Sequence, residues 1–442
     1  MRGRRKWTER SSAVVVRGLG KMLDDLRSLG KNFWLFAVGR FISQLGWAVQ
    51  DVALPLYVLD KTHSGGMMTA FILAEMIPAM IVMPFAGVVG DRYNRKKLMV
   101  WFDIARGILL FGVLAFNLLE LNQLIVVQVV MAVMGTFFGS ATSAMFPDLV
   151  EPDELERANS VNSSMNILAR LVGPALGGFI YAVGGIRLAI LINAVSFFGS
   201  GLFEALIKYE WRTKELESFS QVVDDLREGI SYLLSNRYLR TLMFFALFMM
   251  AFGQPFGAVL MPYSFREVLK FSSYQFGLLE SAFMLGALAG NMLIGMKFGR
   301  KAGMYLFHAL LFDGFMILLF TWAISPLSAF DRTGVFLFLA TINVLWGAVE
   351  AFLSVPLNSK IQRAVPSELR GRVFSAMAVM MHVSGPLGLV AVGPLLDRFP
   401  AWGVSLGLWA GMGAVVAYFW MNHRETLLAD VGGEKNGNAE VT

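Results

Sequence analysis

Residues 87–100, GVVGDRYNRKKLMV, decide the fold because they place a short charged turn between two long apolar runs. One aspartate, two arginines and two lysines stand between positions 91 and 97. Each flanking run is about 20 residues long, enough for a helix to cross a hydrocarbon layer of about 30 Å. The stretch therefore predicts a charged loop that joins two membrane-spanning helices.

The same alternation of apolar runs and polar turns continues through the whole chain. Of its 442 residues, 56% are hydrophobic and 16% are charged, and the mean hydropathy is +0.59. Soluble domains average roughly 45–50% apolar and about 25% charged residues. Because the apolar residues gather in blocks of about 20, we predict an all-α integral membrane protein with twelve transmembrane helices.

The distribution of charge predicts the orientation. The formal net charge is +6, which in a soluble chain could suggest nucleic-acid binding, but cations that hold cytoplasmic loops inside give the same total. Of the 38 lysines and arginines, 29 fall on the side of both predicted termini, six fall opposite and three fall within spans. We therefore expect a multi-pass protein of the inner (cytoplasmic) membrane, with both termini in the cytoplasm and no nucleic-acid partner.

Several function classes lack the residues that they need. The chain has no cysteine and only four scattered histidines, so no metal site is expected. It has no G-x-x-x-x-G-K-[ST] loop, which an ATP-driven pump needs to hold phosphate. No nucleophile–base set is recognisable either. We expect no enzyme activity, no metal and no cofactor.

The chain also divides into two similar halves. VEPDELERANS (150–160) is echoed by AVPSELRGRVFS (364–375), and each is followed further along by Gly-Pro, at 173–174 and 385–386. Such a repeat predicts two pseudo-symmetric six-helix bundles with a path between them. The expected segments are a cytoplasmic basic segment with an amphipathic helix (1–32), a first bundle (33–208), a cytoplasmic linker with an amphipathic helix (209–237), a second bundle (238–421) and a flexible cytoplasmic tail (422–442).

The charged loop has two interpretations. A plain cytoplasmic anchor explains the cations, with Asn94 in a left-handed turn. It does not explain Asp91 or the glycines at 87 and 90. Gly87 and Gly90 lie on the last turn of the preceding helix, where a missing side chain lets another helix approach closely, and Asp91 could pair with an arginine or a helix N-terminus. We favour a latch that forms only when the inner side is shut.

The loop resembles the signature motif of the major facilitator superfamily. Gly87, Asp91, Arg92, Arg95 and Lys96 fall on the motif's positions, while Asn94 stands where the family usually has glycine. GPALGG (173–178) resembles the antiporter motif of that superfamily's drug exporters, and PLNSKIQRAVPSELRGRV (356–373) is similar to its macrolide-efflux and siderophore-exporter branch. The resemblance implies the twelve-helix major facilitator fold, a monomer, and alternating access by rocking of the two bundles.

The Gly-Pro sites are expected to let their helices bend or pack tightly. This helix-bending motif comprises Gly173, Pro174, Gly177, Gly178, Gly385 and Pro386. Breaks in regular backbone at such prolines are tolerated where neighbouring helices satisfy the freed carbonyl groups.

Ionisable residues inside spans are candidates for the transport site, since each costs several kcal/mol to bury in the membrane. The deeper set is Gln50, Asp51, Glu75, Arg170, Asp313 and Glu350. In the superfamily spans 1, 4, 7 and 10 line the cavity, and here these are the predicted spans 33–58, 123–146, 238–265 and 334–359. The resemblance therefore points to Asp51 and Glu350 facing the cavity from opposite halves. A carboxyl group there could exchange a proton for a cationic ligand. The alternative is a purely structural network of Asp51, Glu75 and Arg170.

Other charges lie nearer the span ends. Asp103 and Arg106, at i and i+3, are expected to form an ion pair that braces the charged loop. We expect Arg40 to snorkel to the interface and Glu204 to be interfacial, and we leave Glu280 unassigned.

Span 4 (123–146) departs from the family pattern. It lacks the arginine that drug:proton antiporters usually carry there, and Gln128 is its nearest polar residue. Arg170 in span 5 is the candidate substitute.

These features favour a secondary active transporter, a proton-coupled antiporter that exports amphipathic or cationic organic compounds. Its expected partners are a small amphipathic substrate, protons and the lipid bilayer. One alternative is a facilitator or exporter of a native amphiphile, lysolipid-like or siderophore-like, without proton coupling. Another is a non-transporting sensor on the same scaffold, which loss of the intramembrane carboxylates would have favoured.

Overall fold

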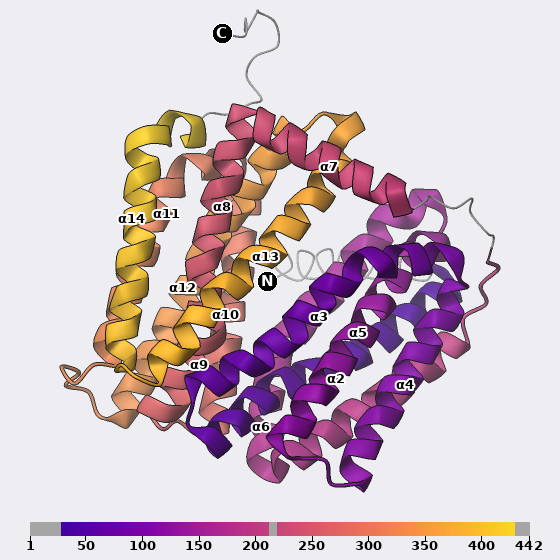
Figure 1. Cartoon of the computed structure of the whole chain (residues 1–442), viewed down its shortest axis with the longest axis horizontal. Helices are drawn as coiled ribbons and strands as arrows, with labels where there is room; N and C mark the ends of the chain where they lie inside the picture. Colours follow the sequence, from indigo (N-terminus) through magenta and orange to yellow (C-terminus); the bar gives the residue numbers. More distant parts are fainter. Residues whose placement is uncertain (1–27, 212–218, 429–442) are drawn as a thin grey trace, which may run out of the picture.

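A computed structural model describes residues 28–211 and 219–428 of the chain. The described residues form helices joined by short turns, without any strand between them. Figure 1 shows two bundles side by side, α2–α6 in one and α8–α14 in the other. The long helices are α2 (Gly30–Thr62), α3 (Gly65–Arg92), α4 (Arg95–Ala115), α5 (Leu121–Met145), α6 (Leu155–Ala205), α7 (Phe219–Ser235), α8 (Arg237–Pro255), α10 (Ser273–Leu293), α11 (Leu306–Ala323), α12 (Arg332–Ala364), α13 (Arg370–Leu396) and α14 (Ala401–Leu428).

The prediction of twelve spans and an all-α membrane fold is confirmed. Within the described residues, ten helices are long and apolar enough to cross a membrane. One of them, α6, is two spans, because Gly185 breaks it with φ 60° and ψ −159°, a conformation open to glycine. The remaining span is α2, whose 33 residues include Arg40 and Asp51.

One span is built from several short elements. After α8 the chain continues through a π-helical turn η3 (Phe256–Leu260), α9 (Met261–Tyr263) and a second π-helical turn η4 (Ser264–Val268). Prolines at 255 and 262 lie in this stretch, and proline removes the backbone N–H that regular helical bonding needs. Such π-helical turns are frequent at functional sites.

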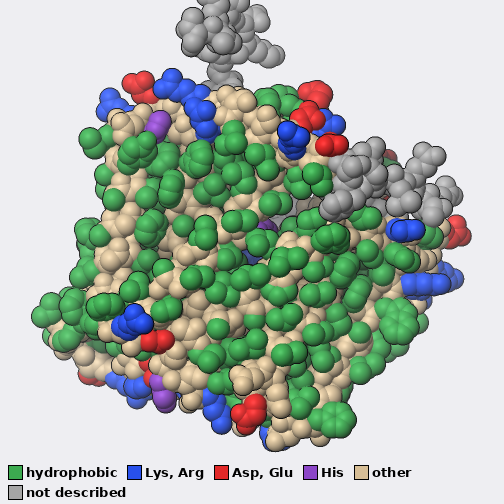
Figure 2. Space-filling model, in the orientation of Figure 1, with side chains coloured by type: hydrophobic (Ala, Val, Ile, Leu, Met, Phe, Trp, Pro, Cys, Tyr) green, Lys and Arg blue, Asp and Glu red, His purple; other side chains and the backbone are tan. Residues whose placement is uncertain are grey.

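The surface matches a membrane environment. Figure 2 shows hydrophobic side chains covering the flank of both bundles, with Lys, Arg, Asp and Glu gathered toward the two ends. Large apolar side chains such as Trp101, Leu202 and Leu311 are exposed. A soluble protein rarely exposes so continuous an apolar surface.

The predicted linker helix is α7, which crosses one end of the molecule (Figure 1). Its apolar stripe packs on the second bundle, where Leu233 is fully buried and Ile230 contacts the same cluster. Arg372 of α13 holds its polar side through Asp225 (2.6 Å) and Glu228 (2.7 Å). The predicted amphipathic helix before Gly30 lies mostly outside the described residues, as does the tail after Leu428.

The internal repeat appears as matching local structure. A short 3-10 turn, η2 (Pro152–Glu154), leads into α6, and an equivalent turn, η7 (Ser367–Leu369), leads into α13. The backbone stays helical through both Gly-Pro sites, and the break in α6 falls at Gly185 instead. The expected bending at the Gly-Pro sites is therefore not accompanied by a break in helical dihedral angles.

Candidate substrate cavity

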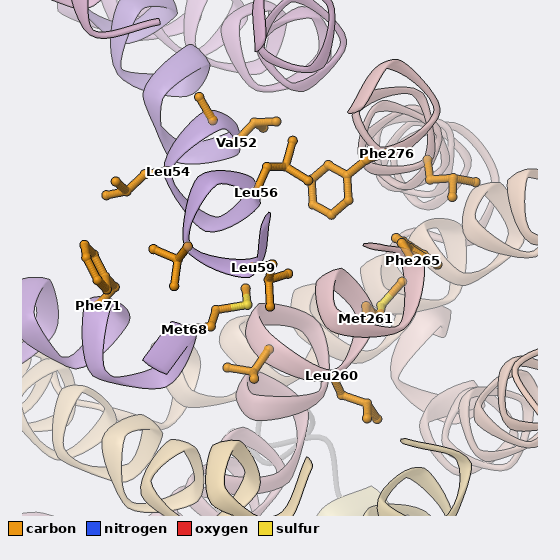
Figure 3. Close-up of a cluster of buried hydrophobic side chains, with 14 of the residues drawn as sticks. Val52, Leu54, Leu56, Leu59, Met68, Phe71, Leu260, Met261, Phe265 and Phe276 are labelled. Atoms are coloured by element: carbon orange, nitrogen blue, oxygen red, sulfur yellow. The ribbon is translucent and has the colours of Figure 1, made fainter. Parts of the chain in front are cut away.

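The two ends of the molecule differ. We call the end crossed by α7 the α7 end, and the opposite end, where α9 lies, the α9 end (Figure 1). At the α9 end, apolar side chains from both bundles meet in one buried cluster. Figure 3 shows Leu56 and Leu59 of α2 beside Met261, Phe265 and Phe276 of the second bundle. This cluster, which we call the apolar plug, fills the space between the bundles at the α9 end.

Charged residues reinforce the plug. Arg266 of η4 donates two hydrogen bonds to Asp60 of α2, from Nε at 2.5 Å and from Nη2 at 2.8 Å. Tyr181 of α6 donates a third, at 2.9 Å. Close by, Glu267 lies 2.9 Å from His63. A bidentate arginine–carboxylate pair fixes orientation as well as distance. These contacts therefore fix the position of the two bundles relative to each other at this end.

A second set of bonds joins α3 to the end of α13. Asp397 accepts hydrogen bonds from the backbone N–H groups of Gly65 (2.7 Å) and Gly66 (3.1 Å) and from Ser64 Oγ (2.9 Å). The first N–H groups of a helix have no partner within it, and a carboxylate suits its positive end. One bundle thus caps a helix of the other.

The GPALGG stretch packs on two neighbours. A Cβ at Gly173 would overlap the side chain of Ala48 of α2, and one at Gly177 would lie 2.9 Å from Val52. On the other side, a Cβ at Gly178 would overlap the Ser273 carbonyl oxygen of α10. The glycines let α6 approach its own bundle and the opposite bundle closely. Gly385 likewise lets α13 approach α8 closely, since a Cβ there would overlap the side-chain oxygen of Gln254.

A cavity of about 1200 Å³ lies between the bundles. Its lining runs from apolar plug residues such as Phe71 and Phe276 to Arg40 and Ser163, which lie toward the α7 end. The plug closes the opposite side, so the cavity extends toward the α7 end. Volumes of about 300–1,000 Å³ already suit drug-sized ligands.

The first bundle supplies most of the polar wall. Asp51, Gln50, Glu75 and Arg170, all singled out from the sequence, line the cavity together. Asp51 and Glu75 lie close enough to repel each other when both are charged. Gln128 of α5 donates a hydrogen bond to Glu75 Oε2 at 2.7 Å. Gln128, the nearest polar residue of span 4, is thus a neutral donor to a carboxylate.

Gln50 faces partly into its own bundle. It is buried, and its Oε1 accepts a hydrogen bond from Asn193 Nδ2 at 2.7 Å. This bond fixes the turn of α2 that carries Asp51. Trp47, one turn earlier, also interacts with the Asp51 carboxylate.

The carboxylate from the second bundle is not the expected one. Glu350 of α12 is not among the residues that line the cavity, whereas Glu280 of α10, left unassigned above, lines it. Glu350 lies on α12 near Asp313 of α11 instead. The neighbouring Ser281 accepts a hydrogen bond from Ala175 N at 3.1 Å, which ties α10 to GPALGG.

A charge cluster in the first bundle borders the cavity, and its two arginines, Arg40 and Arg106, form part of the cavity wall. It comprises Arg40, Asp103, Arg106 and Glu204. Asp103 and Arg106 form the predicted ion pair, and the carboxylates of Asp103 and Glu204 are fully buried. The Arg106 guanidinium lies 4.3 Å from the ring centres of Phe138 and Phe197.

This cluster corrects two expectations. Glu204 is buried rather than interfacial, and Arg40 interacts with Asp103 and Glu204 rather than extending to the interface. Two cations and two anions compensate one another, which is the arrangement that buried charges need.

The charged loop makes its polar contacts within its own bundle. Arg95 is 7% exposed and donates to Ala144 O (3.0 Å) and to Asp148 Oδ2 (3.1 Å). Tyr209 donates to the same carboxylate at 2.8 Å, and burial, followed by this bond, raises the pKa of Tyr209. Arg92 is exposed and Lys96 is half-buried. The Asp91 side chain lies outside the described residues, so the latch stays a prediction.

The plain-anchor interpretation is wrong about Asn94. Asn94 has φ −59° rather than a left-handed conformation, and its side chain caps α4 by accepting from Lys97 N at 3.1 Å. A Cβ at Gly87 would meet nothing within 4 Å, whereas one at Gly90 would lie 3.0 Å from Ser140 Oγ. Only Gly90 has the close approach expected of both glycines.

Comparison with known proteins fixes the family. The model of the Major Facilitator Superfamily matches residues 36–389. The chain belongs to this superfamily. Macrolide efflux protein A of Streptococcus pyogenes is 24% identical over 376 residues, which cover 83% of this chain and 90% of that protein. Multidrug efflux pump Tap of Mycobacterium tuberculosis is 27% identical over 378 residues, 82% of this chain and 87% of the pump.

Solved structures of the superfamily share the fold. A bacterial homologue of the iron transporter ferroportin in its inward-facing state aligns with a TM-score of 0.65 and 19% identity, covering 88% of this chain and 98% of the homologue. In its outward-facing state the TM-score is 0.55, with 18% identity and the same coverage. The chain is thus a multi-pass membrane transporter of the major facilitator type rather than an enzyme.

Proposed function

We propose that this superfamily member is a proton-coupled exporter of amphipathic organic cations. The observation that carries the proposal is the cavity with Asp51 and Glu75 on one wall and Glu280 on the other. The rest of the second bundle's wall is mainly apolar, with Ala258 and Met284 among its members. Carboxylates set in apolar walls suit a ligand with one cationic and one hydrophobic part.

The orientation follows from charge. Basic segments, including the charged loop and the turn before α11, lie at the α7 end, and cytoplasmic loops carry the excess of lysine and arginine. We therefore assign the α7 end to the cytoplasm, with both termini there, in the inner membrane. The cavity then opens inward, in keeping with the higher score of the inward-facing ferroportin homologue. Substrate would be captured from the cytoplasm or the inner leaflet.

Coupling follows from competition at the carboxylates. Two acids as close as Asp51 and Glu75 resist carrying two negative charges, so one proton or one cationic ligand relieves their repulsion. A cation that enters from the cytoplasm displaces the proton, and a proton from outside displaces the cation once the α9 end opens. Gln128 keeps Glu75 in place throughout. Arg170 lines the same cavity and is the cation that we assign to this exchange.

The relatives favour export. Macrolide efflux protein A and multidrug efflux pump Tap are both named for efflux. We expect the chain to act as a monomer, because the cavity is complete within one chain.

The test is uptake of a fluorescent cationic dye into inverted vesicles, with and without a pH gradient. Asp51→Asn and Glu280→Gln should each abolish gradient-driven uptake, and Glu75→Gln should reduce it. Glu350→Gln is the matched control, because it removes a carboxylate of the same bundle that does not line the cavity. We expect its uptake to stay near that of the wild type.

The outcomes separate the alternatives. Uptake that is the same with and without the pH gradient, and unchanged in all three cavity variants, would refute proton-coupled export. A facilitator of a native amphiphile would then be the remaining proposal. Loss of uptake in Glu350→Gln but not in Glu280→Gln would transfer the second carboxylate role back to Glu350.

A further inference from the structure

A second, smaller cavity lies in the second bundle, away from the central one. It is a groove of about 550 Å³ between α8, α11 and α14. Its walls include Phe307, Trp409 and Trp420, and its single acidic residue is Asp313. Leu311 and Phe315 border it and are 70% and 51% exposed on the flank. The groove therefore opens toward the lipid.

Asp313 is poised for a ligand. Its side chain is 5% exposed, and its Oδ1 accepts a hydrogen bond from Trp346 Nε1 at 2.6 Å. The described part of the chain supplies no hydrogen-bond partner for its second oxygen. Its charged neighbour is Glu350, another acid. A buried carboxylate with no cation beside it is costly unless it is neutralised or paired.

The aromatic walls favour the same kind of ligand. The rings of Phe307 and Trp420 meet edge to face with centres 4.4 Å apart, and Trp409 approaches Gly314 of α11. Tryptophan faces attract organic cations, and they also cover hydrophobic chains. A carboxylate beneath aromatic walls, open to lipid, combines both recognition elements.

We propose that this groove binds an amphipathic amine that enters from the bilayer, with its ammonium group on Asp313 and its apolar part between Trp409 and Trp420. This site is separate from the export cavity and does not depend on the proposed direction of transport. Trp346 connects the two, since its ring packs at a tilt against Phe256, with ring centres 5.2 Å apart. Phe256 belongs to the π-helical turn that also supplies Gly257 to the cavity wall.

The test is photolabelling of the full chain in lipid nanodiscs with dodecylamine that carries a diazirine in its chain. The matched neutral probe is dodecanol with the same diazirine, and labelled peptides are located by mass spectrometry. We expect the amine to label peptides of α11 and α14 at least about tenfold more than the alcohol, the ratio expected of a charge-assisted contact.

Two variants and a control locate the site. Asp313→Asn keeps an oxygen for Trp346 and should reduce amine labelling to the level of the alcohol. Gly413→Leu should block both probes, because Gly413 lines the groove and a Cβ there meets nothing within 4 Å. Asp51→Asn removes a central carboxylate and should leave groove labelling unchanged, even where it abolishes transport.

Equal labelling by amine and alcohol would overturn the proposal in favour of a lipid-chain groove. Unchanged amine labelling in Asp313→Asn would also overturn it. So would labelling confined to α2 and α3, which would place all amine binding in the central cavity.

Discussion

The two ends of the molecule are held by different kinds of contact. At the α9 end, Arg266 of one bundle pairs with Asp60 of the other. Toward the α7 end, Arg95 pairs with Asp148, and deeper in the same bundle Arg106 pairs with Asp103. When bundles rock, contacts between them must break, whereas contacts inside a bundle move with it. Pairs at the α9 end should therefore set which side is open, and pairs at the α7 end should set stability.

The largest expected effect is at the buried charge cluster. Replacing Arg106 by leucine leaves Asp103 and Glu204, both fully buried, with Arg40 as their remaining cation. Breaking a buried ion pair costs about 3–5 kcal/mol, because one charge loses its partner. Arg106→Leu should lower the free energy of unfolding by that amount, measured in mixed detergent micelles.

A matched surface pair provides the control. Arg157 and Glu154 also stand at i and i+3 in the first bundle, with side chains 38% and 26% exposed. Exposed pairs contribute only about 0–1 kcal/mol, so Arg157→Leu should change stability little. Equal losses in the two variants would contradict the assignment of Arg106 to a buried network.

The sequence predicted depth in the membrane better than it predicted the direction of side chains. A helix rises by 1.5 Å per residue, so the position of Glu204 or Glu280 along its span follows from the turns on either side. The face that it occupies depends on how neighbouring helices pack, and each residue turns the helix by about 100°. Glu204 thus proved buried in the bundle, and Glu280 rather than Glu350 reached the cavity.

The charged loop shows the same limit. Its position between two spans follows from hydropathy alone, and the pairing of Asp103 with Arg106 follows from helical spacing. The carbonyl group of Ala144 and the carboxylate of Asp148, which bind Arg95, come from a segment far along the chain. Only tertiary packing brings them together, so no local pattern could have named them.

The next effect in size concerns the α9 end. Asp60→Asn removes the charge that Arg266 binds with two hydrogen bonds, and a bond to a charged group contributes about 1.5–3 kcal/mol. The equilibrium between the closed and the open α9 end should therefore shift toward the open state by at least about tenfold, since about 1.4 kcal/mol corresponds to a factor of ten. The chain has no cysteine, so a single Gly135→Cys in the cavity can report access to a membrane-impermeant maleimide.

Gly135 suits this purpose because it lines the cavity and a Cβ there meets nothing within 4 Å. We expect Asp60→Asn to raise the labelling rate from the α9 side about tenfold without lowering the unfolding free energy as Arg106→Leu does. Lys270→Met is the control, because Lys270 pairs with Glu267 of its own bundle. A similar rise in Lys270→Met would show that any lost charge at this end opens the cavity.

The smallest effect is a pH dependence at the α7 end. Burial and the bond to Asp148 raise the pKa of Tyr209. Below the ordinary tyrosine pKa of about 10 the phenol is neutral in both the folded and the unfolded chain, and its stabilising effect is complete. Above that pH the unfolded chain loses the proton first. The stabilisation then declines and is gone once the pH exceeds the folded-state pKa.

Tyr209→Phe should therefore be less stable than the wild type at pH 8, and the difference should shrink as the pH rises above about 10. The measurement is the melting temperature of both proteins across this range, with Tyr274→Phe as an exposed-tyrosine control. Maleimide access in the Gly135→Cys background should stay the same when Tyr209→Phe is added, because Asp148 and Tyr209 belong to one bundle. A change in access from either side would mean that this contact also takes part in gating, and the contrast between the two ends would fail.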